Sequence, residues 1–262
     1  MNKIKIYQID AFTEKVFGGN PAAVCVLNAW LEDEVMQKIA AENNLAETAF
    51  VVPKENDYEL RWFTPTVEVD LCGHATLASA YVLFRYYNHS TDKIIFHSRR
   101  SGLLAVEKNN EELTLDFPAD VVEVTEVPQA LIAAFGKAPV EAYRGKSDYL
   151  LIYASQKEVE DFNPDINLIN SVGARGVIVS AVGYEVDFVS RFFAPQVGVN
   201  EDPVTGSAHT TLTPFWSNKL GKSRLSARQL SQRKGDLKCE LIYDRVRITG
   251  KAVAYLIGEI EF

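Results

Sequence analysis

The segment DLCGHATLASA, residues 70–80, places a cysteine and a histidine where an extended stretch gives way to an alanine-rich helix. Cys72 could be a nucleophile or a metal ligand, and His74 could be a general acid or base because its charge changes near neutral pH. An ordinary hydrogen-bonded histidine at a helix start is an equally good interpretation. The four histidines form no HxH or HExxH spacing and Cys72 has no cysteine nearby, so no zinc site is expected.

A second segment repeats the first in register. RWFTPTVEV (61–69) aligns with RFFAPQVGV (191–199) at five identical positions, with the two arginines 130 positions apart. Three extra residues follow, and CGHA (72–75) then aligns with TGSA (205–208). The pattern is loose enough to arise by chance, but the register favours duplication. It predicts two similar halves, each with a helix start after a strand.

These paired helix starts are candidate anion-binding sites. The first turn of a helix leaves backbone N–H groups without intrahelical partners, and the helix dipole favours negative charge there. Gly73 and Gly206 would let a small carboxylate approach the backbone closely. Asp202 and Ser207 could contact the same ligand, although both residue types are common helix caps. His209, like His74, has either a chemical or a structural role.

Glu47 is a candidate base. In NNLAETAFVV it is the single acidic residue between a helix end and an apolar strand. A carboxylate drawn into apolar surroundings can exchange protons near neutral pH. The alternative is a surface glutamate at a strand edge, and the residues alone leave both interpretations open.

The elements that must position these groups alternate between strands and helices. Leu31, Val35 and Ile39 are four residues apart and predict an amphipathic helix, and the apolar strand TAFVV follows it. FPAD (117–120) is a turn-like seam, after which the alternation begins again. We therefore expect one half over residues 1–117 and a second over 118–262, with a final strand near 252–262 that could return to the first half.

Composition and the absence of certain motifs argue against several classes of function. The 262 residues carry a net charge of −8 and no basic run, which argues against a nucleic-acid partner. Apolar runs are too short to cross a membrane, the amino terminus does not resemble a secretory signal, and three scattered cysteines fit a reducing cytoplasm. P-loop, GxGxxG and GxSxG motifs are absent, so nucleotide binding and serine hydrolysis are not expected.

Five segments together resemble the phenazine-biosynthesis isomerase-like (PhzF-like) family, and they run in order through the chain. They are IDAFTEKVFGGNPAAV (9–24), LAETAFV (45–51), RWFTPTVEVDLCGHATLASA (61–80), DPVTGSAHTTLTPFW (202–216) and VRITGKAVAYLIGEI (246–260). The resemblance implies the α+β fold of diaminopimelate epimerase. In that fold, two pseudo-symmetric halves each wrap a curved, mostly antiparallel open sheet around a central helix.

The resemblance also implies roles for particular residues. Glu47 would be the proton-shuttling base of a cofactor-independent isomerase, with His74, Asp202 and Ser207 as its catalytic partners. The substrate-binding residues would be Asn20, Gly73 and Gly206. A small carboxylate substrate, a homodimer and the absence of a metal or cofactor are further implications.

Epimerases of this fold use one cysteine from each half, which gives an alternative function through Cys72. The position matching Cys72 in the second half is Thr205, whose hydroxyl is far too weak an acid to serve as the opposing base. One-base transfer by Glu47 is therefore favoured over two-base epimerisation. A non-catalytic binding protein that retains the cleft is the remaining alternative. Pro214, about two turns into the second helix, is expected to end or kink it.

Overall fold

The computed structural model describes residues 2–262 and divides into two compact units. Unit 1 comprises the chain up to Asp116 together with Thr249–Phe262, and unit 2 comprises Phe117–Ile248. The sequence predicted a boundary after residue 117 and left the last strand free to return to the first half. In the structure the returning segment begins at Thr249.

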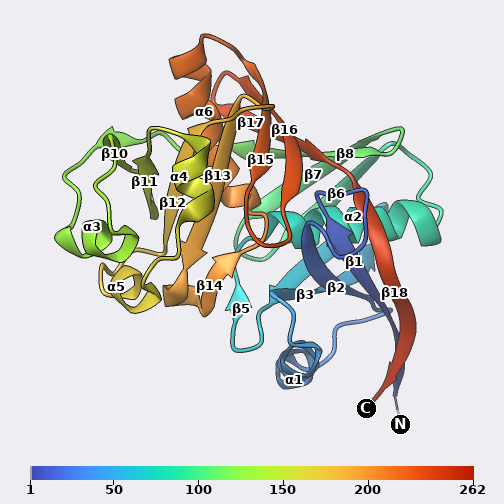
Figure 1. Ribbon diagram of the computed structural model, residues 1–262. Helices are drawn as coiled ribbons and strands as arrows, with labels where there is room; N and C mark the ends of the chain where they lie inside the picture. The colour runs from blue at the N-terminus through green and yellow to red at the C-terminus, as the bar shows by residue number, and fades with distance from the viewer. Residues whose placement is uncertain (1) are drawn as a thin grey trace. The chain divides into compact units, whose positions relative to one another are not determined.

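Unit 1 is a mainly antiparallel sheet with one central helix. Its helices are α1 (Asp33–Asn43) and α2 (Gly73–Tyr86). Its strands are β1 (Lys3–Ala11), β2 (Asn20–Val26), β3 (Glu47–Lys54), β4 (Asp57–Phe63), β5 (Glu68–Val69), β6 (Lys93–Ser98), β7 (Gly102–Asn109), β8 (Glu112–Pro118) and β18 (Ala252–Glu261). The spatial order is β18-β1-β2-β3-β4-β6-β7-β8, and only β2–β3 and β4–β6 among these neighbours pair in parallel (Figure 1). The α2 helix packs against β1, β2 and β3.

Unit 2 repeats this arrangement. Its helices are α3 (Gln129–Phe135), α4 (Gln156–Asp161), α5 (Ile166–Asn170), the 3-10 turn η1 (Pro195–Val197) and α6 (Gly206–Leu220). Its strands are β9 (Glu123–Val124), β10 (Glu141–Arg144), β11 (Asp148–Ile152), β12 (Gly176–Val182), β13 (Phe188–Ala194), β14 (Val199–Asp202), β15 (Arg224–Gln229), β16 (Gly235–Ile242) and β17 (Arg245–Gly250). The order β10-β11-β12-β13-β15-β16 has its parallel pairs at β11–β12 and β13–β15.

The two units therefore share one topology. Parallel pairing of β2 with β3 corresponds to that of β11 with β12, and the β3–β4 hairpin corresponds to β12–β13. In both units a two- to four-residue strand, β5 or β14, leads into the long helix, α2 or α6. The predicted α+β fold, with two similar halves and an open sheet around a helix in each, is confirmed.

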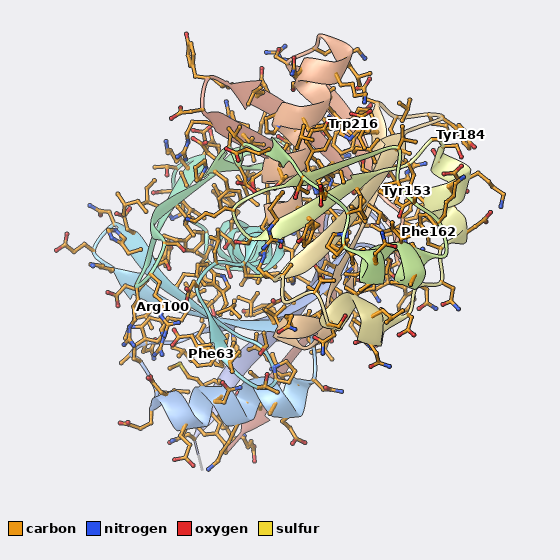
Figure 2. All side chains as sticks on the ribbon, turned by 90° about the vertical axis from the view of Figure 1, so that its left-hand side faces the viewer. Phe63, Arg100, Tyr153, Phe162, Tyr184 and Trp216 are labelled. Atoms are coloured by element: carbon orange, nitrogen blue, oxygen red, sulfur yellow. The ribbon has the colours of Figure 1, made fainter. Side chains whose placement is uncertain are left out.

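Large side chains fix the long helix of unit 2. The Trp216 indole N–H donates to Ser180 Oγ over 2.9 Å, and its ring stacks on Phe188. Elsewhere in this unit the rings of Tyr153 and Phe162 meet edge to face at 4.5 Å, as labelled in Figure 2. Because Trp216 lies on α6 and Ser180 lies on β12, this hydrogen bond joins the helix to the sheet.

Pro214 does not end α6, so that part of the prediction is wrong. The helix continues for six residues beyond the proline, to Leu220. A proline cannot donate to the carbonyl four residues earlier, which here belongs to Thr210. The Asp120 backbone N–H donates to that carbonyl over 3.1 Å. An external donor thus satisfies the carbonyl that the proline leaves open.

Within residues 2–262, no helix combines the length and the apolar character that crossing a membrane requires.

Candidate active site

Glu47 and His74 form the centre of the candidate site in unit 1. Glu47 is the first residue of β3, and His74 is the second residue of α2. Glu47 Oε2 lies 3.2 Å from His74 Nε2, and the two side chains are 15% and 4% exposed. Neither atom has an aligned hydrogen-bond partner among the described residues. Glu47 is therefore a largely enclosed carboxylate facing a buried imidazole, and the surface-glutamate alternative does not hold.

Asn20 determines which nitrogen of His74 carries the proton. The Asn20 side-chain nitrogen lies 3.1 Å from His74 Nδ1. An amide nitrogen only donates, so in the neutral ring Nδ1 accepts and the single proton resides on Nε2, facing Glu47, whereas the imidazolium carries a proton on both nitrogens. Gly19, which precedes Asn20, has a φ of +60°, and a Cβ there would lie 2.1 Å from the Ala11 carbonyl oxygen. The glycine therefore allows the tight turn that places Asn20 next to the His74 imidazole.

The charge state of His74 follows from its neighbours. Burial disfavours the imidazolium, but the Cys72 thiol and the Glu47 carboxylate beside the ring outweigh it and raise the pKa of His74 well above its ordinary value. A raised pKa favours the imidazolium, in which Nε2 carries a proton as it does in the neutral tautomer. His74 can therefore stabilise negative charge on Glu47 or on a bound molecule.

Cys72 is buried and stays protonated near neutral pH. Burial, reinforced by the charge of Glu47, raises the pKa of its thiol to about 11. Ligand atoms of Glu47, Cys72 and His74 all lie within 4.8 Å of one another, which is close enough to consider a metal ion. However, Cys72 Sγ lies 3.5 Å from Nδ1, whereas Glu47 flanks Nε2. The thiol and the carboxylate thus sit at opposite nitrogens of one ring, and the protonated thiol is a poor ligand.

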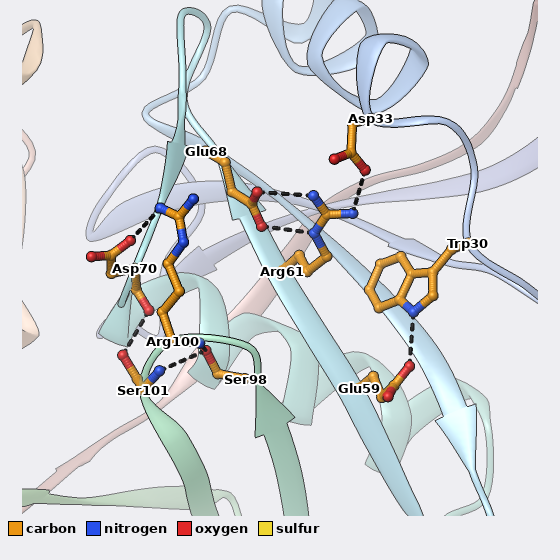
Figure 3. A network of polar contacts seen from close by, with 9 residues as sticks. All are labelled: Trp30, Asp33, Glu59, Arg61, Glu68, Asp70, Ser98, Arg100 and Ser101. Carbon is orange, nitrogen blue, oxygen red and sulfur yellow. Dashed lines mark hydrogen bonds and ion pairs between the residues drawn. The ribbon is translucent and has the colours of Figure 1, made fainter.

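A buried arginine holds the segment that leads into α2. The Arg61 guanidinium donates to both carboxylate oxygens of Glu68, at 2.7 and 2.8 Å, and to Asp33 at 2.7 Å (Figure 3). The Arg61 side chain is only 2% exposed. Because Glu68 lies on β5, this bidentate pair fixes the strand that precedes Cys72 and His74.

The corresponding segment of unit 2 is held in the same way. Arg191 donates to both oxygens of Glu201, at 2.7 and 2.9 Å, and also to the backbone carbonyls of Val159 and Phe162. Glu201 lies on β14, directly before Asp202. Each unit therefore has an arginine–glutamate clamp in front of its long helix.

At the start of α6, Asp202 belongs to a buried network. The Thr205 hydroxyl donates to Asp202 Oδ2 over 2.5 Å. The Gln229 side chain accepts from the Thr205 backbone N–H and donates to the Asp202 carbonyl, at 2.8 and 2.7 Å. The hydroxyl of Thr205, at the position matching Cys72, thus already donates its proton to Asp202. The N-cap residues Cys72 and Thr205 make no side-chain cap of their own.

Ser207 contacts a residue that the sequence did not single out. Arg175 Nη1 donates to Ser207 Oγ over 3.1 Å. The same guanidinium binds both carboxylate oxygens of Asp148, with Nε 2.9 Å from Oδ1 and Nη2 on Oδ2. Ser207 therefore interacts with a fixed cation, and its hydroxyl is half-buried at the second residue of α6.

His209 is a structural histidine. Its Nδ1 lies 2.8 Å from the Thr205 carbonyl, to which it donates, and its ring packs on Phe188. Burial lowers the pKa of His209 to about 4, and the hydrogen bond to the Thr205 backbone offsets only part of that effect. This resolves the choice that the sequence left open for His209 in favour of the structural role.

Comparison with known proteins places the chain in a family. The sequence model of the PhzC-PhzF family, phenazine biosynthesis-like protein, matches residues 9–258. The chain belongs to this family. A relative from Pseudomonas aeruginosa named as an uncharacterized isomerase is 50% identical over 258 residues, covering 98% of this chain and 99% of the relative. Relatives in the PhzC-PhzF family are repeatedly named isomerases, which supports isomerase activity at the level of the family.

Solved structures agree with this assignment. A PhzF family protein from Enterococcus faecalis is 47% identical, covers 100% of both chains and superimposes with a TM-score of 0.97. A hydroxyproline epimerase from Agrobacterium vitis is 9% identical over 98% of this chain and 92% of its own, with a TM-score of 0.65. The epimerase likeness shows the fold alone. The PhzC-PhzF chain therefore shares its architecture with epimerases, as the sequence resemblance implied.

Three residues around the predicted ones were missed from the sequence: Arg175, Asp148 and Gln229. A signal for Arg175 was available, because it directly precedes β12, as Ala46 directly precedes β3 in the matching strand. Extending the repeat to these strands would have placed this arginine one position before the residue that matches Glu47. Gln229 and Asp148 lie in ordinary strands, and no local pattern marks them.

Proposed function

We propose that this PhzC-PhzF protein is a cofactor-independent isomerase that moves a proton between two carbons of a small carboxylate substrate. The observation that carries the proposal is the Glu47–His74 pair, an enclosed carboxylate 3.2 Å from a protonated ring nitrogen. A base in hydrogen-bonding range of a proton donor, but without an aligned bond to it, can turn toward a substrate carbon.

The proposed reaction uses one base and balances without a redox partner. A Glu47 oxygen takes a proton from one carbon, so that a C–H bond breaks and its electron pair enters the adjacent π-system. The protonated Glu47 then returns the proton to a second carbon, where a new C–H bond forms. His74 stabilises the negative charge that develops between the two steps. The enzyme ends in its starting protonation state, so no cofactor is needed.

We assign substrate binding and polarisation to the helix-start residues, on the strength of the repeat and the family. In unit 1 these are Asn20 and Gly73, beside His74. In unit 2 they are Asp202, Gly206 and Ser207. We further propose that the protein acts in the cytoplasm as a homodimer, which the family resemblance supports, and light scattering would test the dimeric state.

The proposal is tested by screening small carboxylate metabolites for deuterium incorporation in heavy water. Glu47→Gln removes the base while keeping its shape, and we expect the exchange rate to fall by about 10²-fold or more. Glu42→Gln, an exposed glutamate at the end of α1, is the matched control and should exchange at the wild-type rate. Wild-type turnover by Glu47→Gln would show that the base is wrongly assigned. Absence of exchange with every metabolite would favour a binding protein.

A second candidate function, epimerisation through Cys72, has one observation in its favour. The thiol lies 3.5 Å from His74 Nδ1, which could accept its proton. Against it, the thiol pKa is raised and Thr205 is bound to Asp202. Cys72→Ser separates the two functions, because epimerisation needs the thiol and the glutamate mechanism does not. Retention of more than about a third of the exchange rate in Cys72→Ser would exclude the epimerase mechanism.

A further inference from the structure

Arg175 is held in place before any ligand binds. Its guanidinium makes two bonds to Asp148, whose side chain is only 2% exposed. The backbone pairing explains this contact, because Asp148 on β11 lies directly opposite Gly176, the residue that follows Arg175. The guanidinium also lies 5.4 Å from the ring centre of Phe192. These contacts leave Nη1 directed at Ser207, while the arginine side chain remains 36% exposed.

This arrangement fixes the direction of hydrogen bonding at Ser207. A serine hydroxyl has one proton and two lone pairs, and an arginine can only donate. Arg175 Nη1 therefore occupies a lone pair of Ser207 Oγ, and the hydroxyl proton must be donated to a different group. The neighbouring groups at the start of α6 are backbone N–H groups, which also donate. The Ser207 hydroxyl and these N–H groups thus all require an acceptor, while the nearby Asp202 carboxylate already accepts from Thr205.

We propose that Arg175, held by Asp148, is a positioning residue that makes Ser207 an obligate donor, so that this part of unit 2 selects a carboxylate. The inference rests on the proposed function, which assigns Ser207 to substrate binding, and it names the chemical class of the group bound there. A carboxylate only accepts hydrogen bonds, whereas a carboxamide presents an NH₂ group to a set of donors. Because Asp148 neutralises the charge of Arg175, the preference for a carboxylate over a carboxamide arises mainly from the hydrogen-bond donors that face the ligand and less from net charge.

Lysine cannot replace arginine in this role. The fork of the guanidinium binds Asp148 with two nitrogens and still directs a third at Ser207, whereas an ammonium is a single point of donation. Arg175→Lys therefore keeps the positive charge and removes the positioning. Arg224→Lys is the matched control, because Arg224 is 82% exposed and pairs with Glu240 at the surface of the same unit.

The test is an NMR titration of the full-length protein with acetate and, separately, acetamide. The backbone amide signals of Gly206 and Ser207 report binding. In wild type and Arg224→Lys we expect acetate to bind at least about tenfold more tightly than acetamide, the effect of one charge-assisted hydrogen bond. In Arg175→Lys and Asp148→Asn we expect this ratio to fall toward one. Unchanged amide dispersion in the spectra checks that each variant is folded.

Ser207→Ala separates positioning from direct contact. If Arg175 acts through Ser207, Arg175→Lys has no further effect on the acetate-to-acetamide ratio in the Ser207→Ala background. Additive effects would overturn the proposal, because they would mean that Arg175 binds the anion itself. A wild-type ratio in Arg175→Lys, or no acetate-dependent shift at Ser207 in wild type, would also overturn it. The readout is binding, so a failure of the isomerase proposal in the deuterium assay would leave this result interpretable.

Discussion

The helix starts of the two units have similar backbones but carry different functional groups. Cys72 and Thr205 occupy equivalent N-cap positions with extended dihedral angles, and an arginine–glutamate clamp precedes each. Unit 1 places the titratable groups Glu47 and His74 at its helix start. Unit 2 instead has hydroxyl and guanidinium donors, at Ser207 and Arg175.

The buried histidines show how this difference arises. Cys72 and Glu47 beside the ring raise the pKa of His74, whereas the ring of His209 donates to a backbone carbonyl and burial lowers its pKa to about 4. Both rings are almost fully buried. Burial alone therefore does not decide the protonation state of these rings, and the groups beside each ring do. Two similar units can thus carry different functional groups at matching positions through changes in a few side chains.

Replacing each of the two buried histidines should have very different consequences for activity. His74→Gln keeps an amide nitrogen near the Nε2 position but removes the titratable ring, so we expect deuterium exchange to fall by about 10²-fold or more. His209→Asn keeps a donor for the Thr205 carbonyl and should exchange within about threefold of wild type. Equal losses in the two variants would contradict the division of roles between the units.

The second prediction concerns the two clamps. Arg61→Met and Arg191→Met each leave a partly buried glutamate without its partner, and we expect each to lower the free energy of unfolding by about 3 kcal/mol. Arg100→Met is the control: Arg100 is 56% exposed and pairs with Asp70 at the surface, so its loss should cost less than about 1 kcal/mol. Urea unfolding measures all three. A large loss in only one clamp variant would show that the clamps are not equivalent.

The smallest effect is a pH dependence of stability that His209 causes. Its folded pKa of about 4 lies below the unfolded value of about 6.5, so the unfolded chain binds the proton first as the pH falls. We expect this group to remove about 2 kcal/mol of stability between pH 7 and pH 5. His209→Asn should lose correspondingly less over that interval in urea unfolding.

The pH dependence of stability that His74 causes has the opposite sign. Its folded pKa is raised, so its contribution to stability is fully present below about pH 6.5 and is lost as the pH rises through the folded value. In His74→Gln, stability should therefore change less than in wild type on the alkaline side. An identical alkaline profile in the two proteins would contradict the raised pKa.

Local patterns in the sequence were sufficient for much of the fold. Four-residue spacing located α1, and the repeat of Arg61 and Arg191 located two strands that lead into helices. The Pro214 expectation was wrong because a helix interior tolerates proline when another segment supplies the missing donor, and Asp120 lies 94 residues away from it in sequence. Such long-range compensation leaves no trace in the local pattern.

Periodicity, motifs and register are properties of neighbouring positions, so the residue types at the site, the family and the two similar halves could be predicted from the sequence. The contacts of Glu47 with His74, of Asn20 with the imidazole and of Arg175 with Ser207 became visible only in the folded chain. Each of these pairs joins different elements of one unit. Their geometry depends on how strands and helices pack, and long-range packing is encoded by the whole unit and not by any one segment.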